Sequence, residues 1–376
     1  MKPIVIIDFS HTCARMLYTA ILQAKPKKQN GMFISSEWIP YFKHLLFNSL
    51  QSVKQRFPGE IIIAMDSSNN WRKDFYNEYK SHRAKGREES EINFPEYYAE
   101  IQEISEVLRL YFPFKVLKVP KVEADDIAGV LANKFGDTKQ VFLVTSDKDW
   151  KQVLAENSFV KMWDPIKKDF QTLTDYEQEL IEPPTGLMSR YTLHHVLLGD
   201  SGDNVPKITD MTEFTDVFKS YLKENEVYAS VPKEFVELSI ADELFEKFDK
   251  YKVIKSGKKK GQFSEDKDIF KSVSLGPVAV NKISESTDTL LEFLNKHPMY
   301  MDNFHRNSTL VDFNAIPEEL QKSIMEEYNI TEINYDPNGI LKYFMDEGLG
   351  QMVSSITKFY DATLETQKQS SLDDFF

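Results

Sequence analysis

Carboxylates follow four short apolar runs in the first half of the sequence, at positions that suit metal-ion chemistry. The runs are Pro3–Asp8, Glu60–Asp66, Phe114–Val119 and Gln140–Thr145. The carboxylates at or just after their ends are Asp8, Asp66, Glu123, Asp125, Asp126, Asp147 and Asp149. Any one of them alone is typical of a helix N-cap or a turn. Gathered at one place they repel one another, and a bound cation would compensate that repulsion.

The ligand types in this set indicate which metal it would hold. Carboxylate oxygens suit hard divalent cations, and Mg²⁺ is the usual choice for phosphate chemistry. A further acidic pair, Asp200 and Asp203, stands in the loop Gly199–Asn204. Cys13 is the single cysteine, which excludes a multi-cysteine zinc site and an intramolecular disulfide and fits a reducing compartment. The sequence therefore predicts a magnesium site.

A basic segment follows the second apolar run directly. Its cations and interleaved aromatic residues are Trp71, Arg72, Lys73, Tyr76, Tyr79, Lys80, Arg83, Lys85 and Arg87. Cations mixed with aromatic rings suit a nucleic-acid backbone and an unstacked base. The ordinary alternative for a charge run is a solvated helix face. Its position next to the carboxylates favours binding of phosphate.

The elements that must position these residues alternate between strands and helices. Helical patterns cover Ile39–Arg56, Pro95–Tyr111 and Glu123–Lys134, between the apolar runs. The runs are nearly continuously apolar, as in strands buried on both faces of a parallel sheet. Ligands of such sheets bind outside the carboxyl ends of the strands. We therefore predict an α/β domain with the carboxylates at one sheet edge, followed by a hairpin over Phe159–Trp163 and Asp169–Leu173.

The pattern along the chain predicts an α/β core followed by a helical region. We place the core at residues 1–184, with the basic segment at about 68–93. The helical region covers 185–364 and contains a charged insertion at about 211–271. Residues 365–376 are predicted to be a flexible tail.

Composition and charge limit the class of protein. The chain has 376 residues, of which 41% are apolar and 28% are charged, which is typical of a globular protein. Its net charge of −13 disfavours a polyanionic partner in bulk, so the local distribution of charge decides what binds. The apolar runs are too short to span a membrane, and the N-terminus lacks a signal-peptide pattern. We expect a soluble cytoplasmic protein with no membrane contact.

Taken together, these motifs resemble the 5′ nuclease superfamily. That group includes flap endonucleases, the 5′-nuclease domains of bacterial polymerases and, nearest in pattern, the ribonucleases H of T-even phages. The blocks that carry the resemblance are Ile7–Ser10, Trp71–Ser90, Glu123–Asp126, Ser146–Asp149 and Gly199–Asn204. The resemblance implies a parallel-sheet, PIN-like core and a helical C-terminal region.

The resemblance also implies a helix–two-turn–helix that binds duplex DNA. Its first half matches Leu198–Pro206, and its second half matches Ser274–Lys282 after the insertion. Because the cost of closing a loop grows slowly with its length, an interrupted motif of this kind is tolerable.

The function implied is two-metal hydrolysis of phosphodiesters during DNA replication. The resemblance implies two Mg²⁺ ions, replaceable by Mn²⁺, and a monomer in a phage or bacterial cell. The enzyme would remove 5′ flaps and RNA primers from branched DNA and RNA–DNA duplexes. The residues matched to the first ion are Asp8, Asp66, Asp125 and Asp147, with Glu123 and Asp126 in or beside its outer shell. Those matched to the second are Asp149, Asp200 and Asp203.

The basic segment matches the family's helical arch. Lys80 and Arg83 match the cations that meet the scissile phosphate, and Tyr79 stands where such proteins stack an end base. The remaining arch cations, matched to contacts with the single strand, are Arg72, Lys73, Lys85 and Arg87.

The tail resembles the clamp-binding box of replication proteins. One helical turn would place Leu372 and Phe375 on the same face, beside Phe376, with Gln369 at the rim. We therefore expect a sliding clamp as a partner.

Two other functions remain open from the sequence. A non-catalytic adaptor that binds branched DNA would be expected to lack acidic residues at the motif positions. A PIN-like ribonuclease would lack the loop Gly199–Asn204 and the long helical region.

Overall fold

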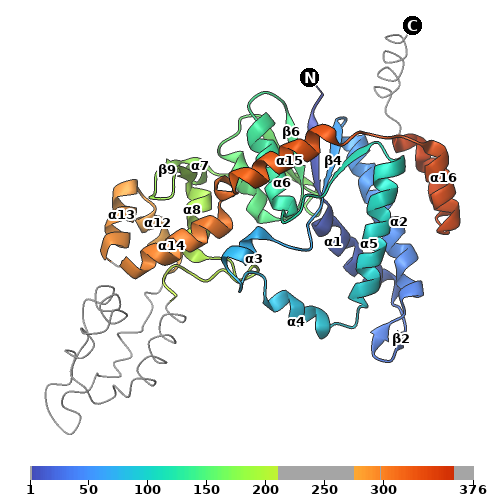
Figure 1. Ribbon diagram of the computed structural model, residues 1–376, viewed down its shortest axis with the longest axis horizontal. Helices are drawn as coiled ribbons and strands as arrows, with labels where there is room; N and C mark the ends of the chain where they lie inside the picture. Colours follow the sequence, from blue (N-terminus) through green and yellow to red (C-terminus); the bar gives the residue numbers. More distant parts are fainter. Residues whose placement is uncertain (1, 211–274, 297, 360–376) are drawn as a thin grey trace, which may run out of the picture. The chain divides into compact units, whose positions relative to one another are not determined.

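The computed structural model describes residues 2–210, 275–296 and 298–359 (Figure 1). The chain forms two compact units. Unit 1 comprises Met1–Glu179 and Phe313–Phe376, and unit 2 comprises Leu180–Asp312. The expected insertion at 211–271 and the tail at 365–376, for which clamp binding is expected, lie outside the described residues. Within the described part, no helix has both the length and the apolar character that crossing a membrane requires.

Unit 1 is built on a six-stranded sheet with the order β5-β4-β1-β6-β7-β8. The strands are β1 Ile4–Asp8, β4 Glu60–Ala64, β5 Phe114–Leu117, β6 Val141–Val144, β7 Val160–Asp164 and β8 Asp169–Gln171. All neighbours are parallel except β7 and β8, which form the predicted hairpin. The predicted α/β class with a mostly parallel sheet is confirmed, and β4 ends two residues before Asp66.

Helices cover both faces of this sheet. They are α1 Phe9–Ala24, α2 Ser35–Arg56, α5 Phe94–Tyr111, α6 Ala124–Phe135, α15 Glu318–Ile330 and α16 Pro337–Asp346, with the 3₁₀ segments η1 Lys148–Leu154, η3 Phe313–Ala315 and η4 Gly350–Phe359. Val5 and Ile7 of β1 join the apolar cluster of α1, α2, α5, α16 and η4. Ile4 and Ile6 join the cluster of α6, η1, η3 and α15. Alternate side chains thus point to opposite layers, which explains why this strand is apolar throughout.

Carboxylates fix where two of these helices begin. The Asp8 side chain accepts a hydrogen bond from the His11 backbone N–H at 2.9 Å, so the last residue of β1 also caps α1. At α6, Glu123 and Asp126 form a reciprocal capping box. β1 therefore passes directly into α1, and a short loop leads from β5 to the capped start of α6 at the sheet edge that carries the acidic residues.

Short elements complete unit 1. They are β2 Lys28–Gln29, β3 Met32–Phe33, α3 Trp71–Phe75, α4 His82–Glu88 and α7 Asp175–Gln178. In Figure 1, α3 and α4 form the connection from β4 to α5. This connection is the basic segment expected at residues 68–93.

The C-terminal segment packs in unit 1. The sequence assigned residues up to 364 to the helical region, whereas α15, α16 and η4 complete the two layers of the α/β unit. A Cβ on Gly129 of α6 would lie 2.8 Å from the Phe313 ring, so glycine lets this returning segment approach closely. The α/β unit is therefore closed by residues far from it in the sequence.

Unit 2 is mainly helical. Its elements are β9 Leu180–Ile181, β10 Met188–Ser189, α8 Arg190–Leu198, α12 Pro277–Ile283, α13 Thr287–Lys296 and α14 Pro298–Val311. Asn307 of α14 donates to the carbonyl oxygens of Val196 at 2.9 Å and Pro206 at 2.7 Å, which ties α8 and the loop after it to α14. Lys207 Nζ donates to the Leu275 carbonyl at 3.0 Å. Both expected halves of the interrupted DNA-binding motif thus belong to one unit.

Candidate active site

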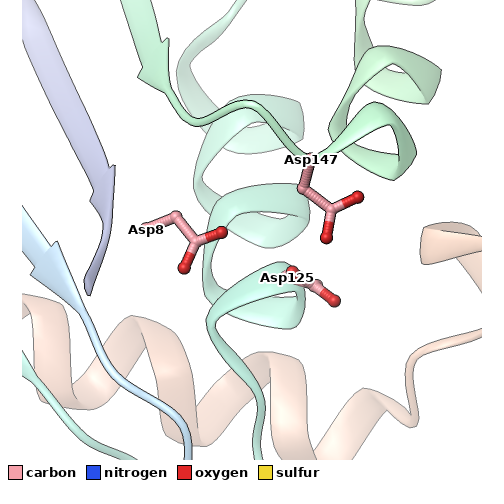
Figure 2. Close-up of side chains that lie close together, drawn as sticks. All are labelled: Asp8, Asp125 and Asp147. Carbon is pink, nitrogen blue, oxygen red and sulfur yellow. The ribbon is translucent and has the colours of Figure 1, made fainter. Parts of the chain in front are cut away.

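Three carboxylates meet at the carboxyl end of the central strands. Asp8, Asp125 and Asp147 each offer an oxygen, and these oxygens all lie within 4.8 Å of one another. Figure 2 shows the three side chains gathered from the end of β1, the start of α6 and the segment after β6. In chain order, the sheet grows from β1 to β4 and β5 and then continues on the other side of β1 at β6. The cluster therefore lies where parallel sheets bind ligands, at the point where strand order reverses.

Thr145 links two of these carboxylates. Its hydroxyl donates to Asp8 Oδ2 at 3.0 Å and accepts from the Asp147 backbone N–H at 3.0 Å. The side chain is fully buried, so this geometry is enforced by packing. Sequence reasoning missed Thr145, although a hydroxyl two residues before a strand-end aspartate was a usable signal.

Trp150 holds the third carboxylate. Its indole Nε1–H donates to Asp125 Oδ1 at 2.6 Å, and the ring is fully buried in η1. This contact was also missed, because nothing in the local sequence indicates which carboxylate a tryptophan will reach.

The electrostatics of the cluster favour a bound cation. Burial raises the pKa of Asp8 to about 7, with added repulsion from Asp66 and Asp147. Burial also raises the pKa of Asp125 well above its usual range, although the charge of Lys80 opposes this shift. Both shifts mean that the ionised carboxylates are destabilised in the metal-free protein. An all-oxygen, partly buried set of this kind fits a hard divalent cation.

Asp66 lies beside the cluster. Its Oδ1 accepts from the Ala124 backbone N–H at 2.8 Å, which connects the end of β4 to the start of α6. The surrounding protein atoms and the charge of Glu123 raise the pKa of Asp66. Its charge also contributes to the shift at Asp8, so the two carboxylates interact electrostatically. Asp66 is exposed in the described structure and is not one of the three that converge.

Asp126 pairs with a guanidinium and is not one of the converging carboxylates, so its expected place in or beside the outer shell of the metal site stays a prediction. The side chain is fully buried and forms an ion pair with Arg72 NH1 at 2.8 Å. Its Oδ2 accepts from Trp71 Nε1 at 3.2 Å and from the Glu123 backbone N–H at 2.9 Å. The carboxylate is thus neutralised by a buried guanidinium.

Glu123 is likewise occupied by cations. It pairs with Lys80 Nζ at 2.6 Å and Arg72 NH1 at 3.3 Å, and it accepts from Tyr79 OH at 3.1 Å. Burial alone would raise the pKa of Glu123, but these two cations lower it to about 2. Glu123 supports the basic segment and is not among the converging metal ligands.

Two residues expected to contact nucleic acid are buried instead. Arg72 and Tyr79 are each 2% exposed. The Arg72 guanidinium is enclosed with Asp126 and Glu123, and their charges raise its pKa against the effect of burial. In this arrangement the Tyr79 ring therefore has no free face for a base, and Arg72 has no access to a phosphate. The neighbouring carboxylates draw both side chains inward, and nucleic-acid contact by these two residues stays a prediction.

Lys80 marks the change from the buried to the exposed part of the segment. It adopts a left-handed backbone conformation with φ 56°. Beyond it, Lys85 and Arg87 are exposed on α4, where no residue is buried. Lys73 and Arg83 are also exposed. The expected role of Lys80 and Arg83 at the scissile phosphate stays a prediction.

The three aspartates matched to a second ion lie in η1 and in the loop of unit 2 that follows α8. The Asp149 backbone N–H donates to Asp147 Oδ1 at 3.0 Å, in the first turn of η1. In unit 2, Asp200 Oδ1 accepts from the Gly202 N–H at 2.7 Å, and Asp200 pairs with Val205 in an antiparallel bridge. Asp203 lies within this loop. The assignment of Asp149, Asp200 and Asp203 to a second ion stays a prediction.

Comparison with known proteins now decides the family. A model described as the 5′-3′ exonuclease N-terminal resolvase-like domain matches residues 3–182, and one described as the T4 RNase H C-terminal domain matches residues 272–359. The ribonuclease H of Enterobacteria phage T4 is 25% identical over 366 residues, covering 95% of each chain. The chain belongs to the 5′ nuclease family.

Other similar proteins align over shorter stretches of this chain. A 5′-3′ exonuclease of Buchnera aphidicola is 27% identical over 237 residues, covering 62% of this chain and 75% of that protein. Among solved structures, the T5 D15 protein co-crystallized with metal ions aligns at 15% identity with a TM-score of 0.47, over 88% of this chain and all of that chain.

Membership of the 5′ nuclease family confirms that the protein is a nuclease. The two alternative functions fit the structure poorly. An adaptor would not need the converging Asp8, Asp125 and Asp147. A simple PIN-like ribonuclease would lack the loop of unit 2 and the C-terminal segment that matches the T4 RNase H model.

Proposed function

We propose that this 5′ nuclease cleaves 5′ flaps and removes RNA primers during DNA replication, with Mg²⁺ as its cofactor. The observation that carries the proposal is the convergence of Asp8, Asp125 and Asp147 at the reversal point of the sheet. The names of its relatives, a ribonuclease H and a 5′-3′ exonuclease, support hydrolysis of RNA–DNA duplexes and of 5′ ends.

The converging carboxylates would hold the cation. When bound, divalent ions supply an activated water and neutralise charge on the attacking and leaving oxygens. Mg²⁺ is the best match because every candidate ligand is a carboxylate oxygen, and Mn²⁺ should substitute for it. Thr145 keeps Asp8 and Asp147 in register, so these two ligands are already oriented in the metal-free protein.

The cations of the basic segment would position the substrate. Lys80 lies next to Glu123, at the start of the helix that carries Asp125, so its ammonium group is close to the acidic edge. We assign Lys80 and Arg83 to the phosphoryl oxygens of the scissile phosphate, where positive charge stabilises the transition state. The exposed Lys73, Lys85 and Arg87 would contact the sugar–phosphate backbone. Such contacts carry no sequence information, so selection should depend on the structure of the nucleic acid.

A cleavage assay with three substrates tests this proposal. The full-length protein is incubated with a 5′-flap DNA, a primer-like RNA–DNA duplex and single-stranded RNA, each with Mg²⁺ and with EDTA. We expect Mg²⁺-dependent cleavage of the first two and no comparable cleavage of the third. Cleavage that persists in EDTA, or a preference for single-stranded RNA, would contradict the proposal. Asp147→Asn is the matched control for a contaminating nuclease.

We also propose that the tail docks on a sliding clamp. Residues 365–376 lie outside the described structure, so the support is the spacing of Gln369, Leu372, Phe375 and Phe376 in the sequence. Deleting Leu372–Phe376 should leave cleavage of a short flap unchanged and abolish stimulation by the cognate clamp. Equal stimulation of the truncated and complete proteins would show that docking occurs elsewhere.

A further inference from the structure

Two adjacent carboxylates of α6 are each held by a tryptophan. Trp150 Nε1–H donates to Asp125 at 2.6 Å, and Trp71 Nε1–H donates to Asp126 at 3.2 Å. Only Asp126 also has a guanidinium partner, Arg72, at 2.8 Å, whereas Asp125 lies in the converging cluster. Both carboxylates thus accept from an indole N–H, but only Asp126 is also neutralised by a cation in direct contact.

We propose that Trp150 is a positioning residue that fixes Asp125 in the orientation required to bind the divalent cation. This inference rests on the proposed metal-dependent function. The chemistry of the donor supports this inference. An indole N–H is uncharged, and it donates a hydrogen bond but cannot accept one. It can therefore orient a carboxylate while leaving its negative charge for the metal. A guanidinium in the same place would compete with the metal, as the pairing of Arg72 with Asp126 illustrates.

Packing makes Trp150 a rigid donor. Its ring is 0% exposed and belongs to the same apolar cluster as Ala124, Ile127 and Ala128 of α6. The helix that carries Asp125 and the η1 segment that carries Trp150 are thus packed against each other. The indole cannot turn away without opening this core, since buried side chains occupy single, closely packed rotamers. The short N–H···O contact is consequently a fixed feature of the site.

The same η1 segment is tied to the rest of the cluster. It begins at Lys148, directly after Asp147, and the Asp147 side chain caps its first turn by accepting from the Asp149 N–H. One short segment therefore orients Asp147 through its N-cap and Asp125 through Trp150. Loss of the indole N–H should release Asp125 alone, and the geometry of Asp147 should survive.

The test measures cation binding by the full-length protein without DNA. Mn²⁺ binding is followed by electron paramagnetic resonance for the wild type, for Trp150→Phe, and for a protein with 3-benzothienylalanine at position 150. That analogue keeps the bicyclic shape and lacks the N–H donor. The matched control is Trp38→Phe, because Trp38 is equally buried and its Nε1 has no hydrogen-bond partner among the described residues.

We expect both changes at position 150 to weaken Mn²⁺ affinity by about 10-fold. Removing a group that orients a metal ligand lowers metal affinity by roughly 10- to 100-fold, and the expected loss is at the lower end of that range. Trp38→Phe should leave the affinity unchanged. The benzothienyl protein should keep the wild-type melting temperature, and excess Mg²⁺ should restore its cleavage rate, since the defect is in occupancy.

The possible failures are distinguishable. Wild-type affinity in the benzothienyl protein, or an equal loss in Trp38→Phe, would overturn the role of Trp150 and leave the proposed function standing. A wild-type protein that binds no Mn²⁺ at millimolar concentration would overturn the metal-dependent function and this inference with it.

Discussion

The two halves of the basic segment have similar composition and different environments. In the first half, Arg72 and Tyr79 are buried, and Lys80 forms an ion pair with Glu123. In the second half, no residue of α4 is buried, and Lys85 and Arg87 face solvent. The difference arises from the carboxylates at the start of α6, which attract and bury the nearer cations. A run of positive charge therefore combines a structural part and a surface part, and only the environment of each side chain separates them.

The largest expected effect comes from breaking the buried half. Arg72→Met leaves Asp126 buried without its counter-ion, whereas Glu123 keeps its pair with Lys80. Removing one partner of a buried pair costs about 3–5 kcal/mol. The free energy of unfolding, measured with urea on the metal-free protein, should fall by that amount. The control is Lys73→Met, whose exposed side chain should change it by no more than about 0.5 kcal/mol. Equal, small effects of the two changes would contradict the structural role assigned to the buried Arg72.

The next largest effect distinguishes the roles of Asp125 and Asp126, the neighbouring carboxylates of α6. Asp125→Asn should lower the flap-cleavage rate by at least about 100-fold. Changing a residue that only orients a metal ligand already lowers metal affinity or activity by roughly 10- to 100-fold, and Asp125 is itself a candidate ligand. It should leave the metal-free protein at least as stable, since it removes one of three repelling charges. Asp126→Asn should mainly reduce stability, because it leaves Arg72 buried with less compensation. Parallel measurement of rates and urea unfolding for the two variants checks this, and the reverse pattern would refute the assignment.

Lys80 tests the boundary between the halves. Lys80→Ala should reduce the single-turnover rate by about 10-fold, with a smaller change in flap affinity, if the ammonium acts mainly in the transition state. Rates at saturating enzyme and affinities in Ca²⁺ give the two quantities separately. If only affinity changes, Lys80 is a plain contact to the backbone of the nucleic acid.

The smallest effect is expected on the exposed half. Arg87→Ala should weaken binding to flap DNA a few-fold and reduce the slope of log affinity against log salt by about 1, as expected for loss of one phosphate contact. The single-turnover rate at saturation should stay at the wild-type value. An unchanged salt slope would mean that α4 does not contact phosphate.

The strands, the main helices and the acidic edge could be predicted from the sequence. Each rests on local patterns, such as the apolar run of β1 and the capping box at Glu123. The different roles of Asp125 and Asp126 could not be predicted, because neighbours on a helix point about 100° apart and the sequence does not say which direction faces the cluster. Arg72 and Lys73 present the same difficulty.

The partner of Trp150 and the distant partner of Thr145 could not be predicted from local patterns, although the spacing of Thr145 and Asp147 was a usable signal. Both link segments that are distant in the sequence, with Trp150 reaching Asp125 and Thr145 reaching Asp8 across 137 positions. The packing of α15, α16 and η4 in unit 1 depends on contacts that are still more distant. Helical periodicity showed that these segments are helices but gave no information on which unit they join.

The return of the chain to unit 1 has a consequence for synthesis on the ribosome. In one layer Phe344 packs on Phe47 at a ring-centroid distance of 5.2 Å, and in the other Tyr328 packs on Phe135 of α6 at 5.2 Å. Both layers of the core therefore use residues translated after unit 2. At roughly 5–20 residues per second, unit 2 takes on the order of ten seconds to emerge. During that interval the apolar faces of α2, α5 and α6 are uncovered, and they are a natural target for chaperones. The nascent nuclease should therefore resist proteolysis only once residue 359 has left the exit tunnel.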